Sequence, residues 1–181
     1  MTVYATLDSP LGELLLVGEE APAAPGGTAL VSLSMPGQKG GAAVRDEWRR
    51  APEAFEEIVR QLRAYFAGEL TRFDIPYAPG TGTDFQRQVW AELDAIPYGA
   101  TTSYGEIARR LGASSVKVRA IGTAIGRNPL LVVRPCHRVI GSDGTLKGYA
   151  GGLERKEQLL RLEGALATDG AVTGDGGRAA G

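Results

Sequence analysis

The only cysteine and the only histidine of the 181-residue chain are neighbours, Cys136 and His137. A thiol becomes a strong nucleophile as a thiolate, and a nearby base or cation favours that form. A single cysteine cannot form a disulfide within the chain, and this pair cannot supply the four ligands of a usual zinc site. The pair therefore indicates either a reactive thiol or a buried, inert one, and a free cysteine taken alone is more often the second.

Positive charge gathers around this pair. The formal net charge of the chain is -1, yet residues 103–147 hold eight lysines and arginines against two acidic residues. Such a patch suits binding of a polyanion, although it is also compatible with an ordinary solvated surface. No apolar run approaches the ~20 residues of a membrane span, and the start lacks the basic segment of a signal peptide. We therefore expect a cytoplasmic protein with no membrane partner, in a compartment that keeps a lone thiol reduced.

Residues 1–81 predict an α+β domain. Three strands are expected from runs of alternating or apolar residues, at 3–7, 13–17 and near 29–33. Apolar residues then recur at helical spacing between Pro52 and Gly68, which suit the start and the end of a helix. Prolines and glycines are concentrated in residues 75–82, which predicts a linker to a second domain.

Residues 82–164 predict a mostly helical domain. Its first helix carries an apolar stripe from Phe85 to Ile96. Ser103 and Glu106 have the spacing of a capping box, which would open a short helix, and a third helix buries Ile121 and its neighbours. Two short helices joined by a glycine-containing turn resemble a helix-turn-helix, a pattern of only moderate specificity for DNA binding.

The Cys-His pair lies between two expected short strands, residues 130–133 and 138–140, and therefore in extended chain. Neighbouring side chains of extended chain point in opposite directions, so we expect a water to bridge Cys136 and His137 rather than a direct hydrogen bond. A last helix covers residues 153–162. Residues 165–181 are rich in Gly and Ala without periodicity, which predicts a disordered tail.

An ordered series of short motifs identifies a family resemblance. The motifs are Ser9-Pro10-Leu11-Gly12, Thr83-Asp84-Phe85-Gln86, Ile96-Pro97-Tyr98-Gly99, Ser103-Tyr104-Gly105-Glu106, Asn128-Pro129, Pro135-Cys136-His137-Arg138-Val139-Ile140 and Gly148-Tyr149-Ala150-Gly151-Gly152. With these spacings the chain resembles the O6-alkylguanine-DNA alkyltransferases over about residues 1–164. The resemblance implies a ribonuclease H-like α+β domain at 1–81 and a helical, winged-helix-like DNA-binding domain at 82–164.

The resemblance also implies the chemistry, which is DNA repair by direct reversal of damage. The alkyl group of O6-alkylguanine, with O4-alkylthymine as a further candidate, moves irreversibly to Cys136, so that each molecule acts once and needs neither cofactor nor metal. The implied partner is double-stranded DNA, bound by a monomer or by a cooperative assembly. The target nucleotide must leave the duplex to meet the thiol.

Individual roles follow from the matching positions. Cys136 is the implied nucleophile and His137 the base, oriented by Glu163, while Tyr104 donates to the guanine and crowds the adjacent phosphate. Arg119 would fill the vacated stack, and Asn128 would fix the turn beside the site. Further basic residues expected to contact DNA are Lys117, Arg109 and Arg110. The remaining pocket and structural residues are Pro135, Val139, Tyr149 and Ala150.

The chain departs from the family pattern at three places. Arg134 replaces an aliphatic residue, the segment 112–119 is one residue longer, and Ala150 replaces a frequent serine. Two other functions remain open at this point. A non-catalytic sensor of alkylated guanine would lack Cys136, and a thiol hydrolase would turn over many substrates and hold its histidine elsewhere in the sequence.

Overall fold

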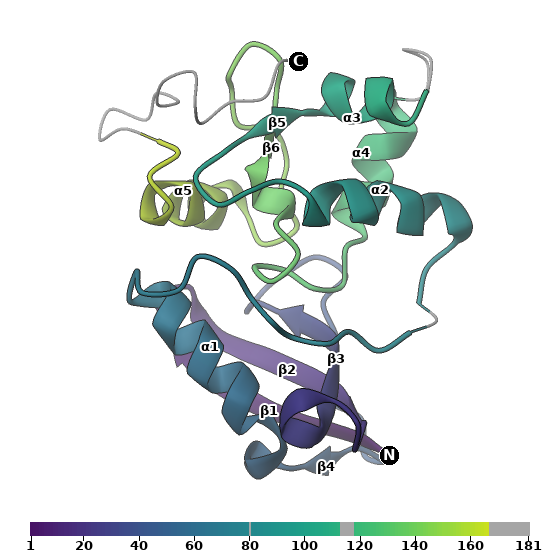
Figure 1. The fold of residues 1–181 in the computed structure, drawn as a ribbon, viewed down its shortest axis with the longest axis vertical. Helices are drawn as coiled ribbons and strands as arrows, with labels where there is room; N and C mark the ends of the chain where they lie inside the picture. The colour runs from purple at the N-terminus through teal and green to yellow at the C-terminus, as the bar shows by residue number, and fades with distance from the viewer. Residues whose placement is uncertain (80, 113–117, 167–181) are drawn as a thin grey trace. The chain divides into compact units, whose positions relative to one another are not determined.

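A computed structural model describes residues 1–79, 81–112 and 118–166. The chain forms two compact units, whose elements are labelled in Figure 1. Among the described residues, the first unit contains Met1–Thr81 together with Pro129–Val133, and the second contains those of Gly82–Asn128 and of 134–166. The sequence placed residues 129–133 in the second domain, but their neighbours in space belong to the first unit.

The first unit is built on a four-stranded sheet with strand order β3-β2-β1-β4. Neighbours β1, β2 and β3 are antiparallel, whereas β4 runs parallel to the start of β1. Their bounds are Thr2–Ser9, Gly12–Glu20, Thr28–Ser34 and, for β4, Arg49–Arg50. The three predicted strands are present and each is longer than expected. The sequence did not predict β4, because a two-residue strand leaves no periodic pattern.

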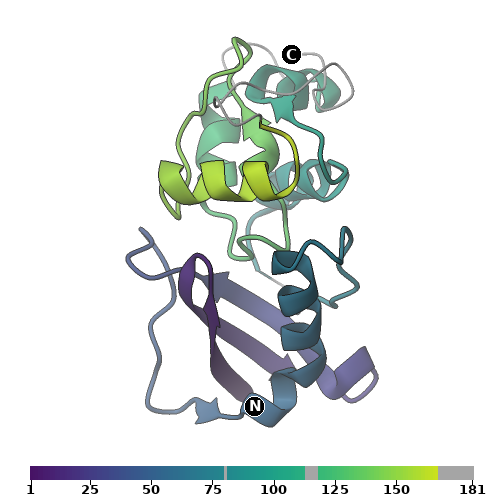
Figure 2. The same cartoon turned by 90° about the vertical axis from the view of Figure 1, so that its left-hand side faces the viewer.

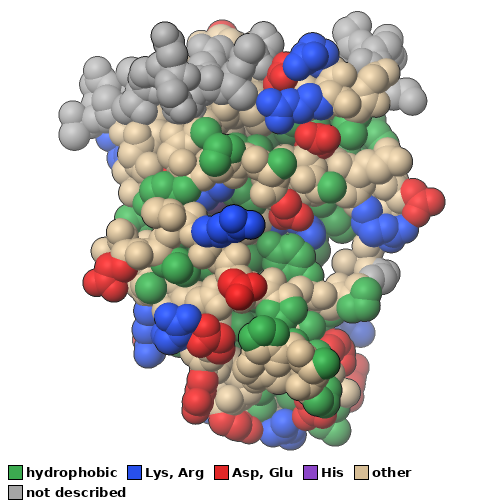
Figure 3. All heavy atoms as spheres, viewed as in Figure 1, with side chains coloured by type: hydrophobic (Ala, Val, Ile, Leu, Met, Phe, Trp, Pro, Cys, Tyr) green, Lys and Arg blue, Asp and Glu red, His purple; other side chains and the backbone are tan. Residues whose placement is uncertain are grey.

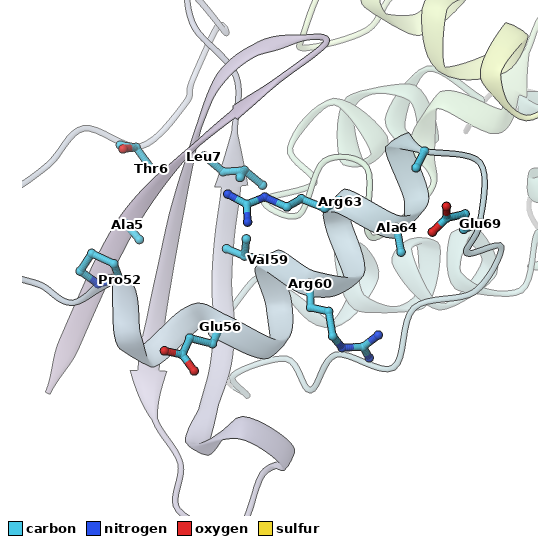
Figure 4. A pocket seen from close by; sticks show the side chains of 11 residues that line it. Ala5, Thr6, Leu7, Pro52, Glu56, Val59, Arg60, Arg63, Ala64 and Glu69 are labelled. Atoms are coloured by element: carbon cyan, nitrogen blue, oxygen red, sulfur yellow. The ribbon is translucent and has the colours of Figure 1, made fainter.

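One helix covers a face of this sheet, as Figure 2 shows. Helix α1 (Glu56–Phe66) follows a 3₁₀ turn at Pro52–Phe55 and buries Ile58, Leu62 and Tyr65. The helix prediction is confirmed, including its end, since Gly68 has a φ of 77° that an L side chain rarely adopts. A groove of about 680 Å³ lies between α1 and β1, and Val59 and Arg63 point from the helix toward the strand (Figure 4).

The expected linker is partly ordered structure. Tyr77 forms a parallel bridge with Leu30 of β3. The amide of Leu30 donates to Pro76 O at 2.8 Å, and the amide of Ala78 donates to Leu30 O at 2.9 Å. Ile75 is buried. The linker prediction is therefore wrong for residues 75–78. Proline and glycine disfavour helix, but an extended segment rich in them can still pair with a strand at the edge of a sheet.

The second unit consists of four described helices and a two-stranded parallel sheet. The helices are α2 (Asp84–Asp94), α3 (Tyr104–Arg110), α4 (Val118–Gly126) and α5 (Leu153–Leu162), and the strands are β5 (Thr102–Ser103) and β6 (Val139–Ile140). Helices α3 and α4 pack together, and the Trp90 Nε1 of α2 donates to Ala124 O of α4 at 2.9 Å. Within the described residues, no helix is long and apolar enough to span a membrane.

The packed part of the chain extends past residue 164. Ala165 and Leu166 are buried in one apolar cluster with Ile140 and Leu160. The prediction that disorder begins at residue 165 is wrong for these two positions, because a glycine-rich composition hid a short apolar pair that can still be buried. Residues 167–181, the rest of the predicted tail, lie outside the described residues.

Candidate active site

A tight turn delivers Cys136. The amide of Cys136 donates to Arg134 O at 2.8 Å, and Pro135 between them has φ -81° and ψ 59°, the conformation of an inverse γ-turn. Proline is restricted to a φ near this value, so the sequence itself favours the turn. Asn128 Nδ2 donates to the same Arg134 carbonyl at 3.1 Å. The carbonyl of Arg134 therefore accepts both hydrogen bonds that hold the segment leading to Cys136.

The Cys-His pair is not in extended chain. Cys136–Arg138 form a 3₁₀ turn, and only the next residues, starting with the fully buried Val139, form a strand. Thr102 of β5 pairs with Val139 and holds the turn at its far end. The expectation of an extended segment is wrong, because the γ-turn at Pro135 redirects the chain immediately before the cysteine.

His137 belongs to a buried network of charged groups. His137 Nε2 lies 2.8 Å from Glu163 Oε2, at the end of α5. The same carboxylate accepts from Arg138 Nε at 2.7 Å and from Arg138 Nη2 at 3.0 Å, and Arg138 Nη1 donates to Ile96 O at 2.6 Å. His137 is 0% exposed, and no histidine surface is visible on the face drawn in Figure 3. The structure brings His137 and Glu163 together as the sequence-based hypothesis requires.

Protonation of this network follows from burial and from Arg138. Burial lowers the pKa of His137, and this effect outweighs the attraction of Glu163, so the imidazole is neutral at neutral pH. Burial alone would raise the pKa of Glu163, but His137 and Arg138 hold it at about 2. A neutral His137 that donates through Nε2 to this carboxylate keeps its Nδ1 lone pair as a proton acceptor. His137 Nδ1 is buried without a hydrogen-bond partner among the described residues.

Cys136 itself is buried, with 3% of its surface exposed. Burial raises the pKa of the thiol, against the opposing effects of a hydrogen bond from Asn128 and of the charges on Lys156 and Arg134. The thiol is therefore protonated at neutral pH and needs a base to become a nucleophile.

Lys156 supplies positive charge to the thiol from α5. Its side chain is 0% exposed, and Lys156 Nζ donates to Lys147 O at 3.0 Å and to Gly148 O at 3.3 Å. Burial lowers the pKa of Lys156 to about 8, while Cys136 opposes this effect. The two carbonyl partners are neutral, so a thiolate at Cys136 is a natural counter-charge. The same bonds anchor the loop that carries Tyr149 and Ala150.

Two tyrosines predicted for the site, Tyr104 and Tyr149, interact electrostatically with Cys136. Burial, with a further contribution from Cys136, raises the pKa of Tyr104 to about 12 and that of Tyr149 well above 10. Both are therefore neutral hydroxyl donors at any physiological pH. The Tyr149 hydroxyl is buried without a hydrogen-bond partner among the described residues, and Ala150 beside it is half-buried.

The basic residues predicted to contact DNA differ in their surroundings. Arg109 and Arg110 of α3 both pair with the buried carboxylate of Glu106, and their side chains are 72% and 39% exposed. Glu106 therefore does not complete the predicted capping box: Ser103 Oγ accepts from its amide at 3.0 Å, but its carboxylate binds the two arginines. A full capping box occurs instead at the start of α2, between Thr83 and Gln86.

Arg119 lies in the first turn of α4 and is exposed. It lines a groove of about 510 Å³ together with residues of α2 and α4, which include Phe85 and Thr123. Lys117, the other basic residue predicted on this helix, lies outside the described residues.

Two buried cations of the site were not predicted from the sequence. Arg138 is part of the sequence-based hypothesis only as a member of the Pro135–Ile140 motif, and Lys156 has no place in that hypothesis. A basic residue inside an apolar helical face was the only signal for Lys156, and Arg138 carried none beyond its place next to His137. No sequence pattern identifies the partners of these residues. Lys156 donates to Gly148 O, eight positions earlier, and Arg138 donates to Ile96 O, forty-two positions earlier.

Comparisons with known proteins identify the family of both domains. Residues 84–165 match the model of the 6-O-methylguanine DNA methyltransferase DNA binding domain, and residues 2–79 match the model of the ribonuclease-like domain of the same proteins. The α+β fold with a ribonuclease-like domain followed by a helical DNA-binding domain, expected from the sequence, is confirmed.

Similar proteins span nearly the whole chain. The methylated-DNA–protein-cysteine methyltransferase of Methanosarcina acetivorans is 49% identical over 90% of this chain and 98% of its own length. That of Mycolicibacterium paratuberculosis is 50% identical over 90% of this chain and 93% of its own length. A crystal structure of Mycobacterium tuberculosis OGT in complex with DNA is 48% identical, with a TM-score of 0.79 over 90% of this chain and 92% of that one.

Proposed function

The chain belongs to the methylated-DNA–protein-cysteine methyltransferase family, and on this premise we propose that it repairs DNA by moving the alkyl group of O6-alkylguanine to Cys136. One observation carries the assignment to these residues. The only cysteine of the chain directly precedes a buried, neutral histidine whose Nε2 is tied to Glu163 and whose Nδ1 is available as a base. A sensor without chemistry would need no nucleophile at this position.

The reaction balances without a co-reactant. His137 takes the thiol proton at Nδ1, through a bridging water, and the resulting imidazolium is stabilised by Glu163. The sulfur attacks the alkyl carbon, so that the S–C bond forms while the C–O6 bond breaks and its electron pair stays on guanine. The guanine regains one proton, which balances the one lost by the thiol. A thioether is stable, and no second nucleophile would remove the group, so each molecule acts once.

The tyrosines and the anchored loop would complete the pocket. Tyr104 and Tyr149 keep their protons at physiological pH, so their hydroxyls can donate hydrogen bonds to the base as negative charge develops on it. Pro135 and Val139 fix the turn from both sides, and Asn128 anchors it from within. Ala150 lies on the loop held by Lys156, where its backbone amide can serve as a donor despite the lost serine hydroxyl.

The proposed partner is double-stranded DNA that contains O6-alkylguanine. Arg109 and Arg110 present exposed guanidinium groups from α3, and they would contact phosphates. Arg119 of α4 would stabilise the duplex around the flipped nucleotide, and Lys117 would contribute a further contact to DNA. We propose a monomer that acts in the reducing environment of the cytoplasm, where its lone thiol stays available.

Restoration of guanine in DNA tests the function directly. The protein is mixed with a duplex whose restriction site is blocked by a single O6-methylguanine, and the DNA is then cut with the restriction enzyme. We expect cutting to be restored in proportion to the protein added, until one protein per lesion is reached. A duplex that stays resistant to cutting at a molar excess of folded protein would contradict the proposed function.

Arg119→Ala is expected to separate nucleotide flipping from thiol chemistry. Without the guanidinium that fills the vacated stack, repair of duplex DNA should slow by about tenfold or more, since unstacking costs a few kcal/mol. Alkylation of Cys136 by iodoacetamide needs no flipping and should be unchanged. Arg109→Ala serves as the control, because loss of one phosphate contact should weaken binding and reduce its salt dependence by about one counterion. An unaltered ratio of the two rates in Arg119→Ala would show that Arg119 does not enter the duplex.

A further inference from the structure

The side chain of Arg134 has no part in the mechanism described so far, yet it is buried, with 8% of the residue exposed. Arg134 Nε lies 3.3 Å from Asp94 Oδ1, and its Cζ lies 5.0 Å from the centroid of the Trp90 ring. Both partners belong to α2. A buried guanidinium is costly unless it is paired or stacked, and this site provides both.

The backbone of Arg134 is the anchor of the nucleophile. Its carbonyl accepts from the amide of Cys136 at 2.8 Å and from Asn128 Nδ2 at 3.1 Å. Arg134 therefore connects two parts of the site. Its side chain contacts α2, and its main chain holds the turn that contains Cys136. Trp90 is itself fixed by its hydrogen bond to Ala124 O, so the side chain rests on two helices that are already tied together.

We propose that Arg134 is a positioning residue for Cys136: its side chain, clamped between Asp94 and Trp90, fixes the turn and holds a positive charge beside the developing thiolate. The role in alkyl transfer rests on the proposed function, whereas the effect on the thiol belongs to the free protein. Arg134 is also a position at which the chain departs from the pattern that the resemblance implies.

Several other ionisable groups surround Cys136. Lys156 from α5 acts in the same direction as Arg134, and both lower the pKa of the thiol against the burial that raises it. Tyr104 from α3 and Tyr149 from the loop keep their protons. The remaining ionisable neighbours form the closed network described above, in which the negative charge of Glu163 is matched by Arg138 next to the neutral His137.

The proposal predicts that three substitutions change the alkylation rate of Cys136 in different directions. Arg134→Met removes the charge but keeps an unbranched side chain over Trp90, so alkylation of Cys136 by iodoacetamide at pH 7.5 should slow by about threefold to tenfold. Its pH profile should move to higher pH. Arg134→Lys keeps the charge and should restore most of the rate. Asp94→Asn removes the negative charge that partly neutralises Arg134, and should speed the reaction.

Cys136 is the only cysteine, so each rate reports one thiol. Arg87→Met is the matched control. Arg87 pairs with Asp84 on the surface of α2, the helix that carries Asp94, so this variant should leave the pH profile unchanged. Superimposable pH profiles for Arg134→Met and the wild type would overturn the proposal. Equal slowing of alkylation by Arg134→Met and Asp94→Asn would also overturn it, because a purely structural role of the clamp predicts that result. Since iodoacetamide needs no DNA, this outcome is distinguishable from a failure of methyl transfer, which would count against the proposed function.

Discussion

Cys136→Ser is expected to abolish methyl transfer from O6-methylguanine while leaving affinity for duplex DNA largely unchanged. A serine hydroxyl fits the same space, but it is far less acidic than a thiol and far less polarisable, and His137 is too weak a base to ionise it. The loss should therefore be complete on the time scale of the wild-type reaction. The measurement is the transfer of a radiolabelled methyl group from duplex DNA to protein, with binding followed in parallel by fluorescence anisotropy.

A methyl group that reaches the folded Cys136→Ser protein would show that another residue accepts it. The second variant Cys136→Ala removes the hydroxyl as well, and the same result is expected for it. Since the cysteine is 3% exposed, neither change alters the surface that meets DNA.

Glu163→Gln is expected to slow transfer by about 10²- to 10⁴-fold, the usual contribution of a general base. The amide is neutral, so it cannot stabilise the imidazolium that forms when His137 takes the thiol proton. Glu163 raises the pKa of His137, so without this carboxylate the pKa of His137 falls further. Thiolate formation at Cys136 then requires a higher pH. The measurement is the single-turnover rate on methylated duplex between pH 6 and 9.

Folding must be controlled in this variant, because Arg138 also loses its buried counter-charge. Glu163→Asp keeps the charge with a shorter reach and should retain part of the rate. Glu157→Gln, on the same helix in a half-buried pair with Arg161, should behave like the wild type. Wild-type kinetics in a folded Glu163→Gln protein would contradict the relay.

Much of this account could be predicted from the sequence because its signals are local. The alternating residues around Val3 and Leu16 predict two strands, which the structure contains. Chemistry was predicted from one adjacency, that of Cys136 and His137, together with the ordered motifs around it.

The remaining features depend on contacts between residues far apart in the sequence. The clamp on Arg134 comes from Asp94, forty positions earlier, and the partner of Arg138 is twenty-five positions later. No periodicity encodes such pairs. The conformation at Cys136 was predicted wrongly for a related reason: apolar residues on both sides resemble strands, whereas the hydrogen bonds of Arg134 O decide in favour of consecutive turns.

The central claim is that Cys136 is a stoichiometric acceptor, and mass spectrometry of the intact protein after incubation with a tenfold excess of O6-methylguanine duplex tests it most directly. We predict a mass increase of one methyl group per chain, located on the peptide that contains Cys136, and no further repair after that point. More than one lesion repaired per molecule, or a methyl group on any other residue, would contradict the account.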